Sequence, residues 1–244
     1  MTGKDFLKAN WNLLKGFKSD QSQGIPHPHV QKPVDRNSVI IDLPAVVQDN
    51  FTDTAILEVI NSRRSVRNFT GGPVSSEELS WLLWSTQGVQ KVLKNGAATL
   101  RTVPSGGARH PFETYLLVNN ITGLDPGFYR YLPLDHSIVR LGGQISPDEV
   151  ITGCLDQTFC GECAVTFVWS VIPYRTEWRY GPVSHKIIAI DAGHLCQNLY
   201  LACTSAGLGT CGIGAYDQKK MDSLLGLDGT DEFVIYLAPV GRRK

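Results

Sequence analysis

The chain has 244 residues, 42% of them hydrophobic, and its 23 basic and 23 acidic side chains give a formal net charge of zero. This composition can bury a sizeable core, and it lacks the basic stripe of a nucleic-acid binder and the charge excess of a disordered chain. No apolar stretch could span a bilayer, and Lys4, Lys8 and Lys15 interrupt any signal-peptide pattern. We therefore expect a cytoplasmic protein with no nucleic-acid or membrane partner.

The N-terminal part of the sequence differs in character from the rest. We interpret residues 1–50 as a helix followed by an extended arm, and residues 51–244 as the main domain. The helix is predicted over residues 4–17 because four apolar side chains share helical spacing, namely Phe6, Trp11, Leu14 and Phe17. The proline-rich, polar stretch that follows predicts an extended connector, and such an arm could wrap over a neighbouring element or another subunit.

Four further helices are predicted along the main domain. The first covers residues 53–61, with Asp53 at its N-cap. The second starts with a capping box between Ser75 and Glu78, and its buried stripe consists of Leu79, Leu82 and Leu83. The third covers residues 191–207 and ends at Gly207, with apolar side chains at helical spacing, Leu195, Leu199, Ala202 and Ala206. The fourth covers residues 217–226.

The strands lie between these helices without regular alternation. Residues 111–120 alternate like a strand, and residues 127–141 predict a hairpin with its turn at residues 134–137. Residues 164–172 form an almost continuous apolar run, which predicts a central strand, and residues 232–241 form a last strand. This mixture favours an α+β fold over a doubly wound sheet.

Two motifs of the sequence are weak signals on their own. Cys160 and Cys163 form a CxxC pattern without a second pair, so we favour ordinary buried cysteines over a redox pair or a metal site. Residues 207–212, GLGTCG, match the dinucleotide fingerprint, but they follow a helix where the fingerprint follows a strand. The glycines still allow the backbone to approach a bulky ligand closely.

Three arginines surround a serine in the segment NSRRSVRNF, residues 61–69. A bound phosphate needs charge-assisted N–H donors from several directions, and the planar fork of arginine supplies them. Cations just beyond the end of a helix also interact favourably with the helix dipole, which is the alternative explanation for these arginines. The segment PSGGARHP at residues 104–111 favours the interpretation as a phosphate site, because it predicts a place for the rest of such a ligand. Small residues before a strand allow close approach to a flat ring, and Ser105 can hydrogen-bond the edge of that ring.

These two segments, together with DAGHLCQNLYLACTSAGLGTCGIGAY at residues 191–216, resemble the FMN-dependent nitroreductase family over roughly residues 35–243. More narrowly, they resemble its SagB-type branch, the dehydrogenases related to thiazole- and oxazole-forming oxidases. The resemblance implies a sandwich with a central, mainly antiparallel sheet flanked by helices. It also implies an intertwined homodimer that holds FMN at the subunit interface.

The resemblance also implies roles for individual residues. The FMN phosphate and ribityl chain would be held by Arg63, Arg64, Ser65 and Arg67. The flavin ring would be lined from the other subunit by Pro104, Ser105, Gly106 and Ala108, the last of which is an asparagine in many relatives. Gln157 would face the pyrimidine edge of the flavin. Gly212, Ile213 and Gly214 would run along the other edge of the flavin ring, near its reactive nitrogen. Arg242 or Arg243 would reach the phosphate.

The chemistry of such a protein belongs to the flavin, while the protein supplies orientation, electrostatics and exclusion of water. We expect a ping-pong cycle in which NAD(P)H transfers hydride to FMN and leaves before a small acceptor enters, with nitro compounds or quinones as surrogates. This cycle requires no catalytic triad. The spacing of His110, His185 and His194 is not that of metal ligands, so we expect no metal.

One position departs from the pattern of the azoline-oxidising members, which carry a Lys-Tyr pair before the helix that starts with DAG. Lys186 stands at the lysine position, but Ile187 replaces the tyrosine. The segment 174–185 either covers the substrate pocket or is a surface loop with Trp178 and Tyr180 packed inward. The candidate substrate-side residues are therefore Tyr180 and Lys186.

Two alternatives stay open beside the NAD(P)H-dependent oxidoreductase. An azoline-to-azole peptide dehydrogenase would work without NAD(P)H and would use oxygen as its acceptor. A flavin-binding carrier or sensor, which belongs to another functional class, would bind FMN without turnover.

Overall fold

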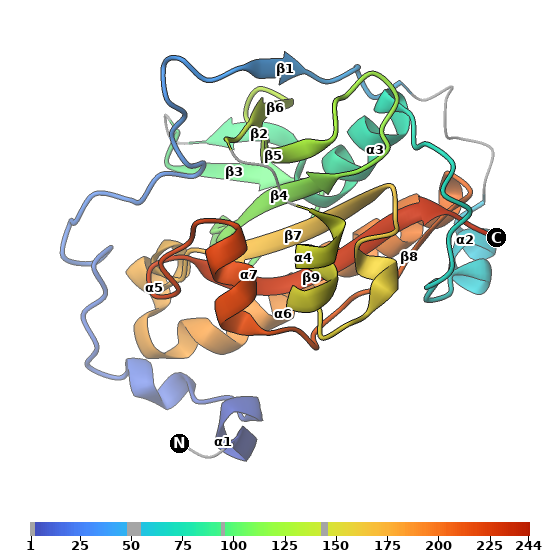
Figure 1. Ribbon diagram of the computed structural model, residues 1–244. Coiled ribbons are helices and arrows are strands. Elements are labelled where there is room, and N and C mark those ends of the chain that lie inside the picture. The colour runs from blue at the N-terminus through green and yellow to red at the C-terminus, as the bar shows by residue number, and fades with distance from the viewer. Residues whose placement is uncertain (1–2, 48–54, 94–95, 143–145) are drawn as a thin grey trace.

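The chain is described by a computed structural model over residues 3–47, 55–93, 96–142 and 146–244. Its main sheet contains seven strands in the order β1-β6-β5-β4-β7-β9-β8, and β2 and β3 form a separate hairpin. Each neighbouring pair in both sheets is antiparallel (Figure 1). The strands are β1 (Ile40–Asp42), β2 (Val89–Leu93), β3 (Ala98–Arg101), β4 (Phe112–Val118), β5 (Gly127–Leu132), β6 (Ser137–Arg140), β7 (Val165–Val171), β8 (Leu208–Thr210) and β9 (Phe233–Arg242).

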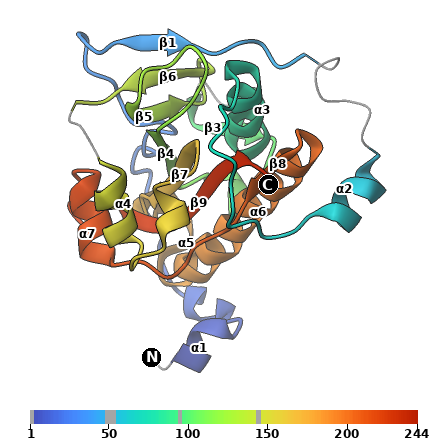
Figure 2. The ribbon, with the colours of Figure 1, turned by 45° about the vertical axis from the view of Figure 1, so that its right-hand side comes forward.

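Helices cover both faces of the main sheet. They are α1 (Gly3–Leu7), α2 (Ile56–Ser62), α3 (Ser76–Gln87), α4 (Pro147–Gly153), α5 (Tyr174–Tyr180), α6 (Ser184–Ser205) and α7 (Gln218–Leu224). Short 3-10 turns are η1 (Trp11–Leu14), η4 (Gly106–Ala108), η5 (Thr158–Cys160) and η6 (Gly181–Val183). Figure 2 shows α4 and α7 together on one side of the sheet and α3 and α6 on the other.

The alternation of side chains along the central strands explains these two layers. Leu116 of β4 and Phe167 of β7 belong to the core cluster that contains the apolar stripes of α3 and α6. The intervening residues Leu117 and Val168 belong to a second cluster, which packs against α4 and α7. Because both faces of β4 and β7 are covered, all seven residues of each strand are buried.

Most of the predicted elements are confirmed by the structure. The amide of Glu78 donates to Ser75 Oγ at 3.2 Å, and the amide of Ser75 donates to Glu78 Oε2 at 2.8 Å, so the capping box is present. The apolar run at residues 164–172 contains β7, which lies between β4 and β9 as a central strand. The α+β class and the antiparallel sheet flanked by helices are therefore correct.

Three predictions about helices need correction. The single helix over residues 4–17 is wrong, because α1 and η1 are separate short elements, and Trp11 and Phe17 are 53% and 43% exposed. The helix predicted over residues 53–61 begins at Ile56, with Ala55 at its N-cap, while Asp53 lies outside the described residues. The helix predicted to start at Asp191 starts seven residues earlier, at Ser184.

The arm is bound to the main sheet by partly buried polar contacts. The amide of Lys32 donates to Glu113 Oε1 at 2.9 Å, and its ammonium donates to Glu232 Oε2 at 2.5 Å. Further along the arm, β1 pairs with β6 and becomes an edge strand of the main sheet. The predicted boundary between arm and domain stays a prediction, because residues 48–54 lie outside the described ranges.

Two further predictions concern single features. Cys160 and Cys163 are free and buried, so their predicted burial is confirmed, while the absence of a redox or metal role stays a prediction. Residues 207–212 follow α6 and enter β8, so they do not have the strand-turn-helix context of a dinucleotide fingerprint. Within the described ranges, none of the helices combines the length and the apolar character that crossing a membrane requires.

Candidate functional site

The arginine segment leaves α2 and runs along the edge of the sheet. The amide of Val66 donates to the carbonyl of Thr210 at 2.9 Å, and the amide of Thr70 donates to the carbonyl of Arg242 at 3.0 Å. This close approach depends on glycine, because a Cβ at Gly209 would lie 2.7 Å from the Cβ of Val66. The backbone that carries the arginines is therefore fixed by β8 and β9.

Tyr200 of α6 connects this segment to the glycine loop. Its hydroxyl lies 3.0 Å from Ser65 Oγ and accepts a hydrogen bond from the amide of Gly212 at 2.8 Å. The guanidinium of Arg63 lies 5.3 Å from the centre of the tyrosine ring, a cation–π contact. Burial raises the pKa of Tyr200, so its hydroxyl keeps the proton that it can donate to Ser65.

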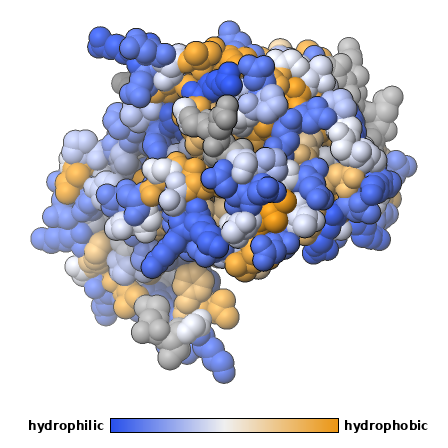
Figure 3. All heavy atoms as spheres, in the orientation of Figure 1, coloured by the Kyte–Doolittle hydropathy of each residue, from blue (hydrophilic) through white to orange (hydrophobic). Residues whose placement is uncertain are grey.

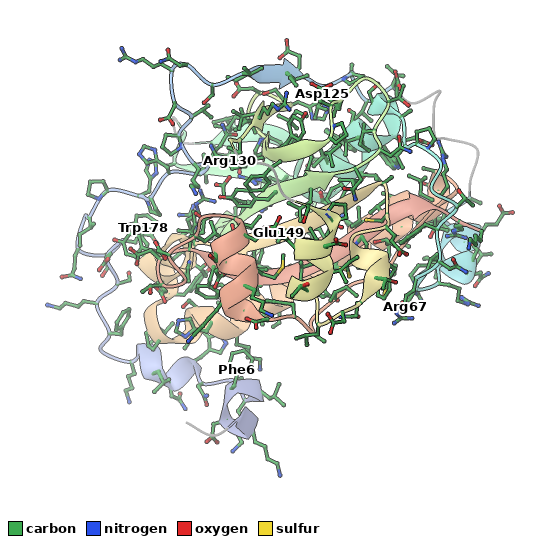
Figure 4. All side chains as sticks on the ribbon, viewed as in Figure 1. Phe6, Arg67, Asp125, Arg130, Glu149 and Trp178 are labelled. Atoms are coloured by element: carbon green, nitrogen blue, oxygen red, sulfur yellow. The ribbon has the colours of Figure 1, made fainter. Side chains whose placement is uncertain are left out.

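The arginines have few internal partners. Arg64 Nη1 donates to the carbonyls of Asn61 and Arg63, at 3.0 and 2.7 Å, so this side chain satisfies carbonyls at the end of α2. Arg67 has no hydrogen-bond partner among the residues that the structure describes, and it projects from the surface (Figure 4). Over the same residues, none of Arg63, Arg64 and Arg67 pairs with a carboxylate.

The two arginines after the last strand differ in their contacts. Arg242 binds Glu78 through two hydrogen bonds of 2.8 and 2.7 Å and donates to the carbonyl of Pro73. Arg243 donates to the carbonyl of Leu208 at 2.7 Å and to Thr204 Oγ1 at 3.3 Å, and it has no carboxylate partner among the described residues. Of the two, Arg243 therefore retains more capacity to bind an anion.

The small-residue loop at residues 104–108 is held by the N-terminal half of α6. Ser105 Oγ donates to Asp191 Oδ2 at 2.6 Å, and the amide of Gly106 donates to the same oxygen at 3.0 Å. Burial raises the pKa of Asp191, while the hydrogen bonds from Ser105 and Gly106 lower it and offset part of the increase. Ile187 fits against Gly106 so closely that a Cβ there would lie 2.3 Å from Ile187 Cγ2. Pro104 is exposed, and Ala108 has a φ of 54°.

The remaining predicted cofactor residues lie around the loop after β8. Gln157 Nε2 donates to the carbonyls of Cys154 and Ala215, at 2.8 and 2.9 Å. Both amide hydrogens are thus engaged, and the amide oxygen is left as an acceptor. Ile213 is buried and pairs with Leu237, while Gly214 is exposed. At Gly212 a Cβ would lie 2.4 Å from the hydroxyl of Tyr236, so the glycine is also required for packing.

The candidate substrate-side residues contact the arm. Segment 174–185 consists of α5, η6 and the first two residues of α6, so it is not the surface loop of one interpretation, although Trp178 is buried as that interpretation expects. Tyr180 is half-buried and stacks edge-on against Trp11, with 6.0 Å between ring centres. Lys186 Nζ donates to the carbonyl of Leu7.

The structure divides the predicted cofactor residues into two groups along α6. Asp191 holds the loop at residues 104–108, whereas Tyr200 holds Ser65 and Gly212. These anchors are nine residues apart, which corresponds to roughly 13 Å of helix. The sequence motifs did not predict that Asp191 and Tyr200 hold these segments in place. The only signal in the sequence is a tyrosine and an aspartate on the predicted helix before the glycine loop.

The histidines have other roles. The ring of His110 is buried, and burial together with the nearby Arg101 lowers its pKa to about 3, so it is neutral at pH 7. His185 Nε2 lies 2.8 Å from Glu177 Oε1. The described parts of the chain contain no cluster of three or more side chains that could hold a metal ion.

Comparison with known proteins adds to this geometry. The sequence profile described as "Nitroreductase family" matches residues 60–242. A protein of Methanocaldococcus jannaschii that carries the provisional name nitroreductase MJ1384 is 32% identical over 203 residues, which cover 83% of this chain and 96% of that protein. The trifolitoxin-processing protein TfxB of Rhizobium leguminosarum bv. trifolii is 28% identical over 133 residues, which cover 52% of this chain and 36% of TfxB.

A solved structure supports the fold. A crystal structure from Anabaena variabilis, described provisionally as a nitroreductase, superimposes with a TM-score of 0.74 at 24% identity and covers 88% of this chain. The match covers 43% of the Anabaena chain, so this chain spans less than half of that protein.

Proposed function

The chain belongs to the nitroreductase family and is an oxidoreductase of that family, and from this premise we propose that it binds FMN and passes electrons from NAD(P)H to a small acceptor. One observation carries the proposal. The backbone of the arginine segment is fixed to the sheet, yet none of its three guanidinium groups has a carboxylate partner among the described residues. Cations that lie on a fixed backbone and have no counter-ion can bind an anion such as the FMN phosphate.

The residues around this segment suit the rest of the cofactor. Arg63 and Arg67 would bind the phosphate, Ser65 would be oriented by Tyr200, and Arg243 would add a third cation. Arg64 would contribute less, because it is engaged at the end of α2. The free amide oxygen of Gln157 can accept a hydrogen bond from the N–H of a pyrimidine ring. FMN itself would supply the hydride transfer.

A second copy of the chain would complete the site in this proposal. The loop that holds Pro104, Ser105, Gly106 and Ala108 is bound to the N-terminal half of α6, away from the arginine segment, so in this proposal these residues would line the flavin of the partner. Exposed apolar side chains support dimer formation, since Ile56 and Leu57 of α2 are 66% and 67% exposed. Ile56 lines a cavity of about 430 Å³, which is also partly lined by Trp81, Trp84 and Leu201.

The double substitution Arg63→Ala and Arg67→Ala tests the phosphate assignment. Each hydrogen bond between charged groups contributes about 1.5–3 kcal/mol, so losing two should weaken FMN binding by roughly two to four orders of magnitude. Arg36→Ala is the control, because Arg36 is an exposed arginine of the arm. A double variant that folds, as judged by circular dichroism, and retains FMN fully would refute the assignment.

A second candidate function is a peptide azoline dehydrogenase of the SagB type. The similarity to TfxB and the position of Lys186 favour it. Ile187 opposes it, because this side chain packs against Gly106 and offers no hydroxyl. A purified protein that consumes oxygen with an azoline peptide in the absence of NAD(P)H would support this candidate over the NAD(P)H-dependent one.

A further inference from the structure

The N-terminal arm folds back over the first half of α6. Trp11 packs edge-on against Tyr180, and Phe17 lies so close to Gly181 that a Cβ there would be 2.2 Å from the Phe17 ring. Figures 1 and 2 both place α1 below α6, apart from the main sheet. In the space-filling view the apolar side chains of this region gather at the lower edge of the molecule (Figure 3).

A cavity of about 270 Å³ lies between the arm and α6. The arm side of the cavity includes two aromatic rings, Phe6 and Trp11, and Figure 4 shows Phe6 at α1. Val183, Ile187 and Ile190 form its other side. The volume and the aromatic walls suit a ligand with one aromatic ring, since drug-sized ligands occupy cavities of roughly 300 Å³ and more.

The charged or titratable side chains that line the cavity are basic, and two of them have a carboxylate partner outside the lining. Its charged or titratable lining residues are Lys8, His185 and Lys186, with no carboxylate among them. Lys8 is paired with Asp5 at 3.1 Å, and His185 is paired with Glu177 at 2.8 Å. Lys186 differs, because its only partner among the described residues is the neutral carbonyl of Leu7. An ammonium group has three donors, so two of them stay available.

We propose that this cavity binds a small aromatic carboxylate. The ring lies between Phe6, Trp11 and Ile187, and the carboxylate accepts hydrogen bonds from Lys186 Nζ. Ile187 also contacts Gly106, so the ligand lies next to the loop that we propose to line the flavin. The walls of the cavity come from a single chain, and the binding therefore does not require FMN or a second subunit.

Calorimetric titration of the purified protein with benzoate, without an electron donor, tests this proposal. Benzamide is the matched neutral probe. We expect benzoate to bind more tightly than benzamide, and Lys186→Met to weaken benzoate binding at least about tenfold while leaving benzamide unchanged. Lys15→Met is the control, because Lys15 is an exposed lysine of the same arm that does not line the cavity.

A second variant keeps the proposal testable if Lys186→Met fails to fold. Phe6→Ala removes part of the aromatic wall, and we expect it to weaken both probes. The proposal is overturned if neither probe binds, or if benzoate binds equally well to the wild type and to folded Lys186→Met. Flavin absorbance of the same samples is a separate readout, so failure of the FMN proposal and failure of this one are distinguishable.

Discussion

The amide of Gly212 donates a hydrogen bond of 2.8 Å to the hydroxyl of Tyr200, and through it the glycine loop is joined to the arginine segment. The same hydroxyl lies 3.0 Å from Ser65 Oγ. Since Gly212 supplies the hydrogen of the first contact, the proton of the tyrosine can serve the second. Tyr200 thus holds together two segments that are about 145 residues apart in the sequence.

Tyr200→Phe should weaken FMN binding without unfolding the protein. The substitution keeps the ring beneath Arg63 and removes only the hydroxyl, so we expect FMN to bind about threefold to tenfold more weakly. Fluorescence titration of the flavin-stripped protein measures this change. Tyr174→Phe is the control, since that hydroxyl is exposed and bonds Asp20 of the arm. Equal affinity in Tyr200→Phe and the wild type would show that the hydroxyl does not organise the site.

Asp191→Asn should loosen the loop at residues 104–108. The carboxylate accepts hydrogen bonds from Ser105 and Gly106, and an amide in its place turns one acceptor into a donor. We expect the free energy of unfolding, measured with urea at pH 7, to fall by about 1–3 kcal/mol. An unchanged unfolding curve would mean that the loop is held by other contacts.

His110 should make the protein less stable in acid. Its pKa is lowered to about 3 in the folded protein by burial and by Arg101, whereas an unfolded chain has a histidine pKa of about 6.5. Between these values the unfolded chain binds more protons, so stability is lost as the pH falls below about 6.5. From pH 7 to pH 5 this residue should cost about 2 kcal/mol.

His110→Asn is the variant that isolates this effect. The residue has a φ of 43°, a conformation that asparagine tolerates well. We expect the variant to lose less stability than the wild type between pH 7 and pH 5, as measured by urea unfolding at both values. Parallel losses in the two proteins would contradict the assignment of the acid sensitivity to His110.

Glu113→Gln should destabilise the fold strongly. Glu113 Oε1 accepts a hydrogen bond of 2.5 Å from Arg175, and Oε2 lies 3.6 Å from Arg130, with all three residues buried. Removing the carboxylate leaves two guanidinium groups buried beside a neutral amide, which costs about 3–5 kcal/mol. Glu162→Gln, at an exposed position, is the control. A loss of stability below about 1 kcal/mol would argue that the network is already screened by water.

The sequence predicts those features of the fold that depend on local pattern. The capping box of Ser75 and Glu78 and the apolar run of β7 are of this kind, because their signals lie within a few neighbouring residues. The prediction of a single N-terminal helix also used only local spacing, and it is wrong. Its apolar spacing is helical, but Phe6 and Trp11 line a cavity against α6 and belong to separate short elements, so tertiary packing overrides the local preference.

The predicted site was recognisable only in part. Arg63 and Arg67 stand out in the sequence as cations crowded around a serine, and Gly106 as part of a small-residue loop. The residues that position them, Tyr200 and Asp191, do not stand out in the sequence, because they act through contacts with segments that are distant in the sequence. The hydrogen bonds between Arg242 and Glu78 could not be predicted from the sequence either, because they join the last strand to α3.

The central claim, that the arginine segment binds FMN for electron transfer, is tested most directly by the absorption spectrum of the purified protein and by identification of the flavin that heat releases. We predict a yellow protein that releases FMN and is bleached by NADH or NADPH without oxygen. A yellow protein that neither nucleotide bleaches would contradict the proposed electron donor and favour a carrier or an azoline dehydrogenase. A colourless protein that does not take up added FMN would contradict the central claim.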